Sequence, residues 1–342
     1  MERLDAFMAR ANAAYYATRD PFADFTTSPE ITQVFGEILG LWAAVVWDGM
    51  GRPDPVHLVE LGPGRGTLMR DACRAVHQVM PGFGAALRLH LVETSPRLRA
   101  IQAELLPDAT WHDTVDTVPP GPMVLLANEF LDALPIRQFV RREDGWAERF
   151  VDGSVFVERP SPNPDPFPKG EGTGKPSPLG KGLGEGLSAA QEGDVLELNE
   201  PALALATRIA TRLATQGGAA LFLDYGPARS APGDSLQALR ASRPADPLAE
   251  PGSADLTAHV DFQAFAEAAA GAQVHGPIAQ GPFLAALGLF QRSGQLARTQ
   301  PPARAAALIQ AAQRLAEPDR MGGLFKALAL CQPGGPTPPG FP

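Results

Sequence analysis

The chain has 342 residues, of which 44% are hydrophobic, so it can bury one large core or two modest ones. Its formal net charge of −9 argues against nucleic acid or an anionic membrane as the main partner. The two cysteines, Cys73 and Cys331, predict neither a disulfide framework nor a zinc or other metal site, and they fit a reducing compartment. We find no signal-like N-terminus and no apolar run of membrane-spanning length, and therefore expect a soluble, bacterial-type protein in the cytoplasm.

Residues 1–50 are predicted to form an N-terminal helical cap. The first helix, over 1–20, ends at Asp20-Pro21, because proline stops helix propagation. A second helix begins at Ser28-Pro29-Glu30, with serine at the N-cap, proline in the first turn and an acid at the positive end of the dipole. A capped, packed helix explains the apolar periodicity. It does not explain the polar residues at its start, which are candidates for covering a ligand: Thr27, Ser28 and Glu30.

A glycine turn joins the next two predicted elements. The apolar run Val56–Leu61 predicts a strand, and apolar residues at helical spacing predict a helix over 68–80. The last residues of the strand and the turn between them form the candidate binding loop: Glu60, Gly62, Pro63, Gly64 and Gly66. A strand, a glycine turn and a helix in this order bring backbone N–H groups and a helix N-terminus against a ligand.

The spacing in this turn discriminates between ligands. A dinucleotide loop reads GxGxxG, whereas this chain has GxGxG, with Glu60 two residues before the first glycine. A carboxylate at that place repels a diphosphate and attracts an ammonium or a sulfonium. S-adenosylmethionine carries both cations and a ribose, so we predict it as the cofactor. The alternatives are a nicotinamide dinucleotide, which Glu60 disfavours, and a glycine turn with a purely steric role.

Two further strand ends supply acids for the same ligand. The apolar run Leu87–Val92 ends at Glu93, and an acid at the tip of the second strand holds ribose hydroxyls in nucleotide-binding α/β folds. A third strand is expected to end near Trp111, which makes Asp113 a candidate for the adenine edge. The alternative for Asp113 is a surface loop.

Polar residues directly follow the fourth and fifth predicted strands, at 123–127 and 219–223: Asn128, Glu129, Asp132, Asp224 and Tyr225. Ligands in open α/β sheets bind at the carboxyl ends of strands, so we expect these side chains to face the cleft. If the segment after the fourth strand is helical, Glu129 and Asp132 lie on one face. The alternative is a solvated pair or a helix cap.

Other patterns interrupt or follow this alternation. Period-two segments with Asp-Gly turns predict an antiparallel meander inserted over 138–198. Within it, every even position from Pro160 to Gly186 is proline or glycine, so residues 160–187 are expected to be a disordered surface insert. His259 lies between two aspartates in a loop that opens a helix, which makes it a pocket candidate or a structural histidine. After a strand at 273–280, the remainder through Leu330 has a helical pattern, and 332–342 is expected to be a frayed tail.

The strand–helix alternation over 56–226 predicts an α/β fold with a parallel, doubly wound sheet. We expect residues 51–230 to form the cofactor-binding core, with the meander inserted into it. Residues 231–342 are expected to complete the fold with C-terminal helices that cap the substrate side.

Seven sequence blocks, in order along nearly the whole chain, resemble the MidA-type methyltransferases, which include the mitochondrial arginine methyltransferase of complex I assembly. These blocks are DFTTSPEITQVFGE (24–37), VELGPGRGTLMRD (59–71), LVETSP (91–96), ANEFLDALPIRQF (127–139), LDYG (223–226), ADLTAHVDF (254–262) and QGPFLAALGL (280–289). The insert around 160–186 lies outside every block and is the clearest departure from the family.

The resemblance implies a class I, Rossmann-like methyltransferase fold, S-adenosylmethionine as cofactor and a protein substrate. The mitochondrial precedent is an arginine of the 49-kDa-type subunit of NADH dehydrogenase. We expect Asn128 below the reacting methyl, Glu129 and Asp132 as the fork-like partners of an arginine guanidinium, and a lining of Asp224, Tyr225 and His259. An alternative of another class is a cofactor-binding assembly factor that holds a partner subunit, with methylation incidental.

Overall fold

The computed structural model describes residues 1–19, 26–161 and 190–342, so most of the insert predicted at 160–187 lies outside the described residues. The chain divides into two compact units. The sheet unit comprises Thr26–Phe130, Ile209–Tyr225 and Gly271–Pro342. The meander unit comprises Met1–Phe25, Leu131–Arg208 and Gly226–Ala270. Within the described ranges, no helix is both long and apolar enough to cross a membrane.

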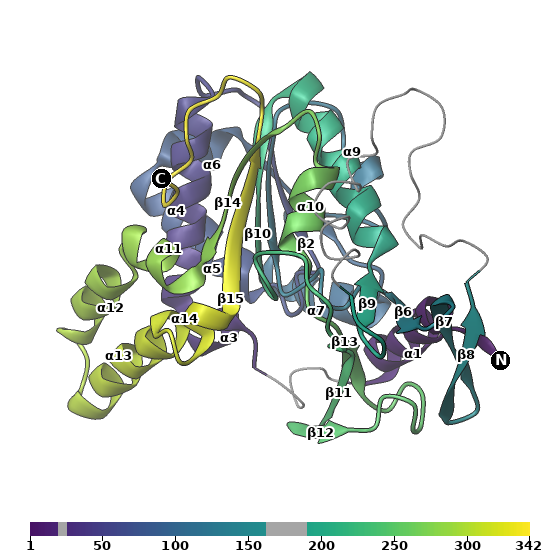
Figure 1. Cartoon of the computed structure of the whole chain (residues 1–342). Helices are drawn as coiled ribbons and strands as arrows, with labels where there is room; N and C mark the ends of the chain where they lie inside the picture. Colours follow the sequence, from purple (N-terminus) through teal and green to yellow (C-terminus); the bar gives the residue numbers. More distant parts are fainter. Residues whose placement is uncertain (20–25, 162–189) are drawn as a thin grey trace. The chain divides into compact units, whose positions relative to one another are not determined.

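The sheet unit is built on a seven-stranded sheet with the order β14-β15-β10-β5-β2-β3-β4. Figure 1 labels four of its strands, β14, β15, β10 and β2. Its strands are β2 (Val56–Leu61), β3 (Leu87–Val92), β4 (Thr110–His112), β5 (Met123–Asn128), β10 (Gly218–Tyr225), β14 (Gln273–Ala279) and β15 (Phe325–Cys331). The neighbours from β4 to β10 pair in parallel, whereas β15 pairs antiparallel with both β10 and β14. The predicted parallel sheet is confirmed. Strands covered on both faces are near-continuous apolar runs, and this is why the sequence pattern located them.

Parallel pairing brings the carboxyl ends of these strands to one edge of the sheet. Leu61 at the end of β2 lies beside Val92 of β3 and Ala127 of β5. Asn128 at the end of β5 lies beside Leu223 of β10. The residues that follow these positions include the acids and glycines predicted to bind the cofactor, so the fold gathers them along one edge.

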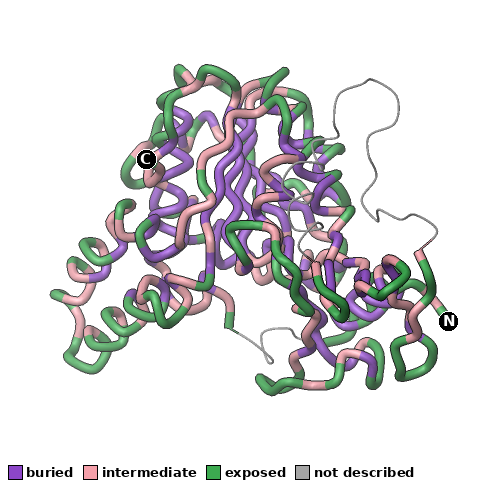
Figure 2. Tube along the Cα trace, viewed as in Figure 1, coloured by how far each residue is buried: buried purple, intermediate pink, exposed green. Residues whose placement is uncertain are grey.

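Helices α4 (Gln33–Gly49) and α5 (Thr67–Val79) cover one face of the sheet. Their buried side chains pack on the residues of β2 and β5 that point to the same face, including Val56, Leu58, Val124 and Leu126. A Cβ on Gly40 would lie 2.7 Å from the Cα of Ala72, so only glycine permits this approach of the two helices. Each large side chain buried in this core stabilises the fold by about 1.5–3 kcal/mol. Figure 2 shows the central strands buried along most of their length.

The helices before and after the glycine turn differ in part from the predictions. The helix predicted from Ser28 onward is broken: α3 (Ser28–Ile31) ends at Thr32, which is extended with φ −159° and ψ 139°. The Thr32 hydroxyl then caps α4 by accepting from Val34 N. After α5, Pro81 begins a further short helix, α6 (Pro81–Ala86), because proline is well suited to a first helical turn. Helix α7 (Pro96–Leu105) follows β3, with Ser95 as its N-cap.

The C-terminal part of the sheet unit corrects two predictions. Residues through Leu330 were expected to be helical after 289, yet only α12 (Leu289–Ala297), α13 (Pro302–Ala316) and α14 (Met321–Leu324) are, and β15 is an inner strand between β14 and β10 (Figure 1). The predicted strand and helix before them are present as β14 and α11 (Gln280–Ala286). The tail is packed where we expected fraying: Trp42 Nε1 donates to Pro339 O at 3.1 Å, and Phe341 stacks on Phe283 at 5.2 Å between ring centroids.

The meander unit confirms the predicted antiparallel insertion. Its strands β6 (Arg137–Arg142), β7 (Gly145–Asp152), β8 (Val155–Pro160) and β9 (Val195–Leu198) pair antiparallel, and β1 (Glu2–Arg3) adds to β7. A second small sheet holds β11 (Gln237–Arg240), β12 (Arg243–Ala245) and β13 (Asp255–Thr257). Helix α1 (Leu4–Thr18) packs on both through Leu4, Phe7, Met8 and Ala11. The remaining helices are α10 (Phe262–Ala268) and α9 (Glu200–Gln216), which contributes residues to both units, and a 3₁₀ turn lies at Val115–Thr117 in the sheet unit.

Candidate cofactor and acceptor site

The glycine turn after β2 has the backbone conformation that its sequence demands. Gly62, Gly64 and Gly66 have φ values of +60°, +54° and +82°, in the left-handed region that side chains with a Cβ disfavour. At Gly62 a Cβ would also lie 2.7 Å from the ring of Phe130. Gly66 is the N-cap of α5 and offers no side chain to cap it. The turn therefore presents backbone and a helix N-terminus at the sheet edge, as predicted.

Glu60 is buried at the end of β2, with 3% of its surface exposed. Among the described residues, its Oε2 atom has no hydrogen-bond partner. Burial, with a further contribution from the charge of Glu93, raises the pKa of Glu60 to about 8. A buried carboxyl with an unpaired oxygen is costly unless a ligand satisfies it, and a cation does so best.

Glu93, which follows β3, lies close enough to Glu60 for their charges to interact. Its Oε1 accepts from Ser95 N at 2.7 Å, and its Oε2 receives a longer contact of 3.5 Å from Gln102 Nε2. Burial raises the pKa of Glu93, and the bond from Ser95 N opposes this shift. The carboxylate is thus fixed in orientation while it remains half-buried at the edge, as a group that binds ribose hydroxyls requires.

The residues after β5 form a tight polar turn. Glu129 has φ +50°, a strained conformation for a residue with a side chain and one often found at functional sites. Its Oε1 accepts from Ser28 N at 2.8 Å and from Asn128 Nδ2 at 3.0 Å. Burial raises the pKa of Glu129, and these two bonds oppose the shift. In the described structure Asn128 Oδ1 is buried without a partner, which leaves an acceptor at this edge for a ligand.

Helix α3 contributes the three residues predicted to cover the site, although not by the predicted capping. The N-cap residue is Thr27, and its side chain makes no capping bond. Ser28 is fully buried, its N–H binds Glu129, and its hydroxyl lies close enough to that carboxylate to oppose the rise in the pKa of Glu129. Glu30 accepts a hydrogen bond from the hydroxyl of Thr67, the first residue of α5. Helix α3 is therefore tied both to the residues after β5 and to the helix after the glycine turn.

Asp224, predicted to line the site, also has a structural role. Its carboxylate accepts from Phe130 N at 3.1 Å and from Tyr225 N at 2.9 Å, so it fastens the turn after β5 to the end of β10. The half-buried Tyr225 packs on Phe325 with ring centroids 5.4 Å apart. Asp113 follows β4, as expected, but 78% of its side chain is exposed and it pairs with Arg99 at 2.6 Å.

Asp132 and His259 belong to the meander unit. The segment after β5 forms a turn, so the helical arrangement that would place Glu129 and Asp132 on one face is absent. The left-handed Glu129 bends the chain away from a helical path. Asp132 is 6% exposed, and its carbonyl accepts from Ala258 N at 2.9 Å. His259 is exposed, and its backbone N–H binds Ser235 Oγ at 2.8 Å.

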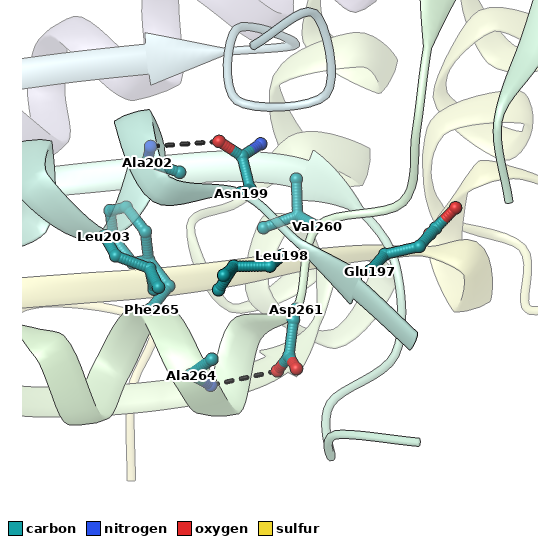
Figure 3. A pocket seen from close by; sticks show the side chains of 9 residues that line it. All are labelled: Glu197, Leu198, Asn199, Ala202, Leu203, Val260, Asp261, Ala264 and Phe265. Atoms are coloured by element: carbon teal, nitrogen blue, oxygen red, sulfur yellow. Dashed lines mark hydrogen bonds between the residues drawn. The ribbon is translucent and has the colours of Figure 1, made fainter. Parts of the chain in front are cut away.

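The aspartates on either side of His259 have structural partners. Asp261 accepts from Ala264 N at 2.9 Å and caps α10, and Asn199 similarly binds Ala202 N at 3.0 Å (Figure 3). The cavity between these two caps measures about 20 Å³, enough for one water molecule and no cofactor. Asp255 accepts from the Tyr16 hydroxyl at 2.8 Å, and burial and the negative charge of Asp255 raise the pKa of that phenol.

The sequence patterns did not predict one buried residue at this edge of the sheet, Gln102. Gln102 of α7 is fully buried and contacts both the glycine turn and Glu93. The available signal was a polar residue one helical turn after Leu98, on the apolar stripe of α7.

Comparison with known proteins identifies the family of the chain and its cofactor. A family described as "Putative S-adenosyl-L-methionine-dependent methyltransferase" matches residues 38–278, more than half of the chain. The chain belongs to this methyltransferase family. It is thus an enzyme of the S-adenosylmethionine-dependent class, and the predicted cofactor is confirmed.

Curated relatives match over most of their length. The Danio rerio protein named "Protein arginine methyltransferase NDUFAF7, mitochondrial" is 34% identical, over 92% of this chain and 79% of its own. The Drosophila melanogaster homolog is 34% identical over 96% and 80%, and the Homo sapiens protein 33% over 92% and 76%. These relatives are mitochondrial by name, so the prediction of a bacterial-type cytoplasmic location is wrong. It rested on the absence of a targeting pattern, which is weak ground for a compartment.

A crystal structure of a Burkholderia thailandensis protein bound to S-adenosyl-homocysteine superposes with a TM-score of 0.77. The two are 27% identical, over 96% of this chain and 87% of that one. The methyltransferase has the predicted class I fold, with its parallel sheet and the antiparallel β15 near one edge.

The residues of this methyltransferase fit S-adenosylmethionine. The unpartnered Glu60 Oε2 suits the ammonium of the cofactor, and the Gly62 turn leaves room where a Cβ would meet Phe130. Glu93 suits the ribose. A pyrophosphate fits poorly, because two carboxylates flank the turn, and the alternative of a nicotinamide cofactor is disfavoured.

Proposed function

We propose that this methyltransferase transfers the methyl group to an arginine of a protein. A 49-kDa-type subunit of NADH dehydrogenase is the first candidate acceptor. The observation that carries the proposal is the buried polar turn after β5, where Glu129 and Asn128 offer oxygen acceptors at the sheet edge. The names of the curated relatives support arginine as the acceptor.

The residues proposed to bind the cofactor fall into groups according to the part of the cofactor that each would contact. Glu60 and the turn Gly62–Gly66, with Pro63 and Gly64 between, bind the amino-acid end of the cofactor, and Glu93 binds the ribose. Asp113 is assigned to the adenine edge at the end of β4. When bound, S-adenosylmethionine would supply an electrophilic methyl group on a sulfonium, with the neutral thioether as the leaving group.

The acceptor requires orientation more than activation. A guanidinium stays protonated with a pKa above about 12, and its planar fork matches a carboxylate. Glu129 is held by Ser28 N and Asn128 Nδ2, so its orientation is fixed before a substrate arrives. Its raised pKa makes it the better proton acceptor when the methylated guanidine must lose a proton. Asp224 and Tyr225, which belong to the same unit as Glu129, are assigned as lining residues.

Helix α3 serves as the cover of this site. Ser28 directs both its N–H and its hydroxyl towards Glu129, and Glu30 accepts a hydrogen bond from the first residue of α5. A cover excludes water from the reacting groups and holds the acceptor in line. Thr27, the residue before Ser28, is assigned to the entrance of the site.

The test is identification of the acceptor. Extract from cells that lack the enzyme is incubated with the pure enzyme and methyl-labelled cofactor, and labelled bands are mapped by mass spectrometry. We expect methylarginine in a polypeptide. Label confined to a small molecule, or to another amino acid, contradicts the proposal.

Glu129→Gln isolates the acceptor step. It keeps the shape of the side chain and removes the charge, so turnover should be abolished while affinity for S-adenosylhomocysteine stays within a few-fold. The exposed Glu143→Gln is the matched control and should behave as wild type. Retained turnover in Glu129→Gln removes Glu129 from the mechanism.

A further inference from the structure

Helix α7 carries one uncharged amide on its buried side, and this amide makes three contacts. Gln102 is 0% exposed. Its Nε2 donates to Gly64 O at 2.8 Å and approaches Glu93 Oε2 at 3.5 Å. Its Oε1 accepts from Trp111 Nε1 at 2.8 Å. Gln102 therefore contacts the glycine turn, the acid after β3 and a residue of β4 at once.

The chemistry of these partners admits only one orientation of the amide. The indole of Trp111 can only donate, so Oε1 of Gln102 must face it. Gly64 O and the ionised carboxylate of Glu93 can only accept, so both require the NH₂ group. Each of the two amide hydrogens then has its own acceptor. The side chain also packs close to the turn, because a Cβ on Gly66 would lie 3.5 Å from Gln102 Cγ.

We propose that Gln102 is a positioning residue for the cofactor, with Trp111 fixing the direction of its amide. It links the turn assigned to the amino-acid end of the cofactor to the acid assigned to the ribose, and so sets the spacing between them. The inference rests on the proposed assignment of the glycine turn and Glu93 to the cofactor. It does not depend on the identity of the methyl acceptor.

Three substitutions separate positioning from packing. Gln102→Met keeps the volume but removes the two donors, and we expect the Kd for S-adenosylhomocysteine to rise about tenfold or more. Trp111→Phe removes only the group that orients the amide, so a smaller rise of about two- to fivefold is expected. Leu98→Ala is the control, because Leu98 is buried on the same helix and is absent from these contacts. It should lower the melting temperature and leave Kd unchanged.

A double-mutant cycle distinguishes positioning from packing, because it measures the coupling between Gln102 and Glu93, which a loss of packing alone does not produce. Kd is measured by calorimetry for wild type, Gln102→Met, Glu93→Gln and the double variant. If Gln102 acts through Glu93, the double variant loses less affinity than the two single losses combined. Additive losses, wild-type affinity in Gln102→Met, or an equal loss in Leu98→Ala overturn the proposal. Unchanged affinity in Glu93→Gln instead overturns the assignment of Glu93 to the ribose, which distinguishes failure of the site from failure of Gln102.

Discussion

Three neighbouring strands of the sheet each carry a histidine and, at or just beyond their carboxyl ends, an acid. The acids are Glu60, Glu93 and Asp113, and the histidines are His57, His90 and His112. The histidines satisfy one another: His57 Nδ1 and His90 Nε2 lie 2.9 Å apart, as do His90 Nδ1 and His112 Nε2. Thr117 Oγ1 at 2.9 Å and Pro120 O at 3.3 Å complete this histidine chain at its two ends.

The rings can all be neutral. The Thr117 hydroxyl donates to Thr114 O at 2.9 Å, so it accepts from His112 Nδ1. Each neutral ring then donates one N–H to the next, from His57 Nδ1 to His90 Nε2 and from His90 Nδ1 to His112 Nε2. Burial lowers the pKa of each ring, and that of His90 to about 4, with the neighbouring histidines contributing. Arg88, Arg99 and Arg212 add positive charge nearby, partly offset at His112 by Asp113. The chain needs no ligand.

The acids differ because Glu60 has no partner for Oε2 among the described residues. Burial disfavours charge in both regions, and the cofactor proposed to bind here would supply the cation that Glu60 lacks. A buried polar group that the protein itself satisfies stabilises the fold, whereas one left unsatisfied is a candidate for ligand binding. The same strands thus carry a polar cluster that the protein satisfies itself and the acids proposed to bind the cofactor.

The largest expected effect follows from removing the charge of Glu60. Glu60→Gln should weaken binding of S-adenosylmethionine by about 30-fold or more, in line with the roughly 2 kcal/mol or more lost when a buried charge pair is broken. The variant without cofactor should be more stable than wild type at pH 8. The pKa of Glu60 is raised on folding, so its contribution is full below about pH 4.5 and is lost as pH rises towards 8, by about 1.4 kcal/mol per unit.

Calorimetry for affinity and thermal unfolding at pH 6 and pH 8 measure both effects. Glu143→Gln, at an exposed position, serves as the control for the amide substitution. Tight binding by Glu60→Gln would show that the acid edge is not defined by this charge.

The affinity of the wild type should itself depend on pH. Glu60 must be ionised to pair with the ammonium of the cofactor, and with its pKa near 8 the affinity should rise up to tenfold per pH unit between pH 6 and 8. Above that, the α-amino group loses its own proton at about pH 8, so the profile should be bell-shaped. The acid limb should be flat in Glu60→Gln. A profile unchanged by the substitution assigns the titration to another group.

Much of this edge could be predicted from the sequence, because it depends on local order. A buried apolar run, a glycine turn and a capped helix follow one another in the chain, and parallel pairing brings their ends together. The bonds that fix the site could not be predicted. Ser28 N reaches Glu129 across 101 positions, and Gln102 reaches Gly64 across 38, and neither pairing leaves a local pattern.

The strand missed at the C-terminus has a similar cause. Residues 325–331 read FKALALC, and alanine and leucine favour helix when no neighbours are considered. The segment is extended because β10 and β14 offer it backbone partners on both sides. Tertiary pairing overrode local propensity. The break at Thr32 was missed because a continuous apolar period disguised the separate N-cap of α4.

Disrupting the histidine chain should lower the stability of the fold moderately and leave the cofactor affinity unchanged. His90→Gln breaks both ring contacts and should cost about 1–3 kcal/mol at pH 7, because it leaves buried nitrogens of His57 and His112 unpaired. His77→Gln, at an exposed histidine, is the control. Denaturant unfolding measures the stability and calorimetry the cofactor affinity. A loss of affinity without loss of stability would place the chain in the site.

The histidine chain should also determine how the free energy of unfolding changes as the pH falls below neutrality. Its lowered pKa values mean that the stability it contributes is full above about pH 6.5 and is lost as pH falls towards 4. His90→Gln should therefore unfold less steeply with acid than wild type between these values. This dependence is opposite in sign to that of Glu60, and an equal slope in both proteins would contradict it.

The smallest expected effect concerns Asp113, the most exposed of the three acids. Its side chain is 78% exposed and pairs with Arg99, so Asp113→Asn should change the free energy of unfolding by less than about 1 kcal/mol. If Asp113 contacts the adenine, Asp113→Asn should bind the cofactor a few-fold more weakly than wild type. The expected loss is small because this contact involves no buried charge. The exposed Asp108→Asn is the matched control, because it makes the same change of acid to amide at a surface position near β4. Equal affinities in the two variants would reduce Asp113 to a surface acid and leave Glu60 and Glu93 as the acids that define the edge.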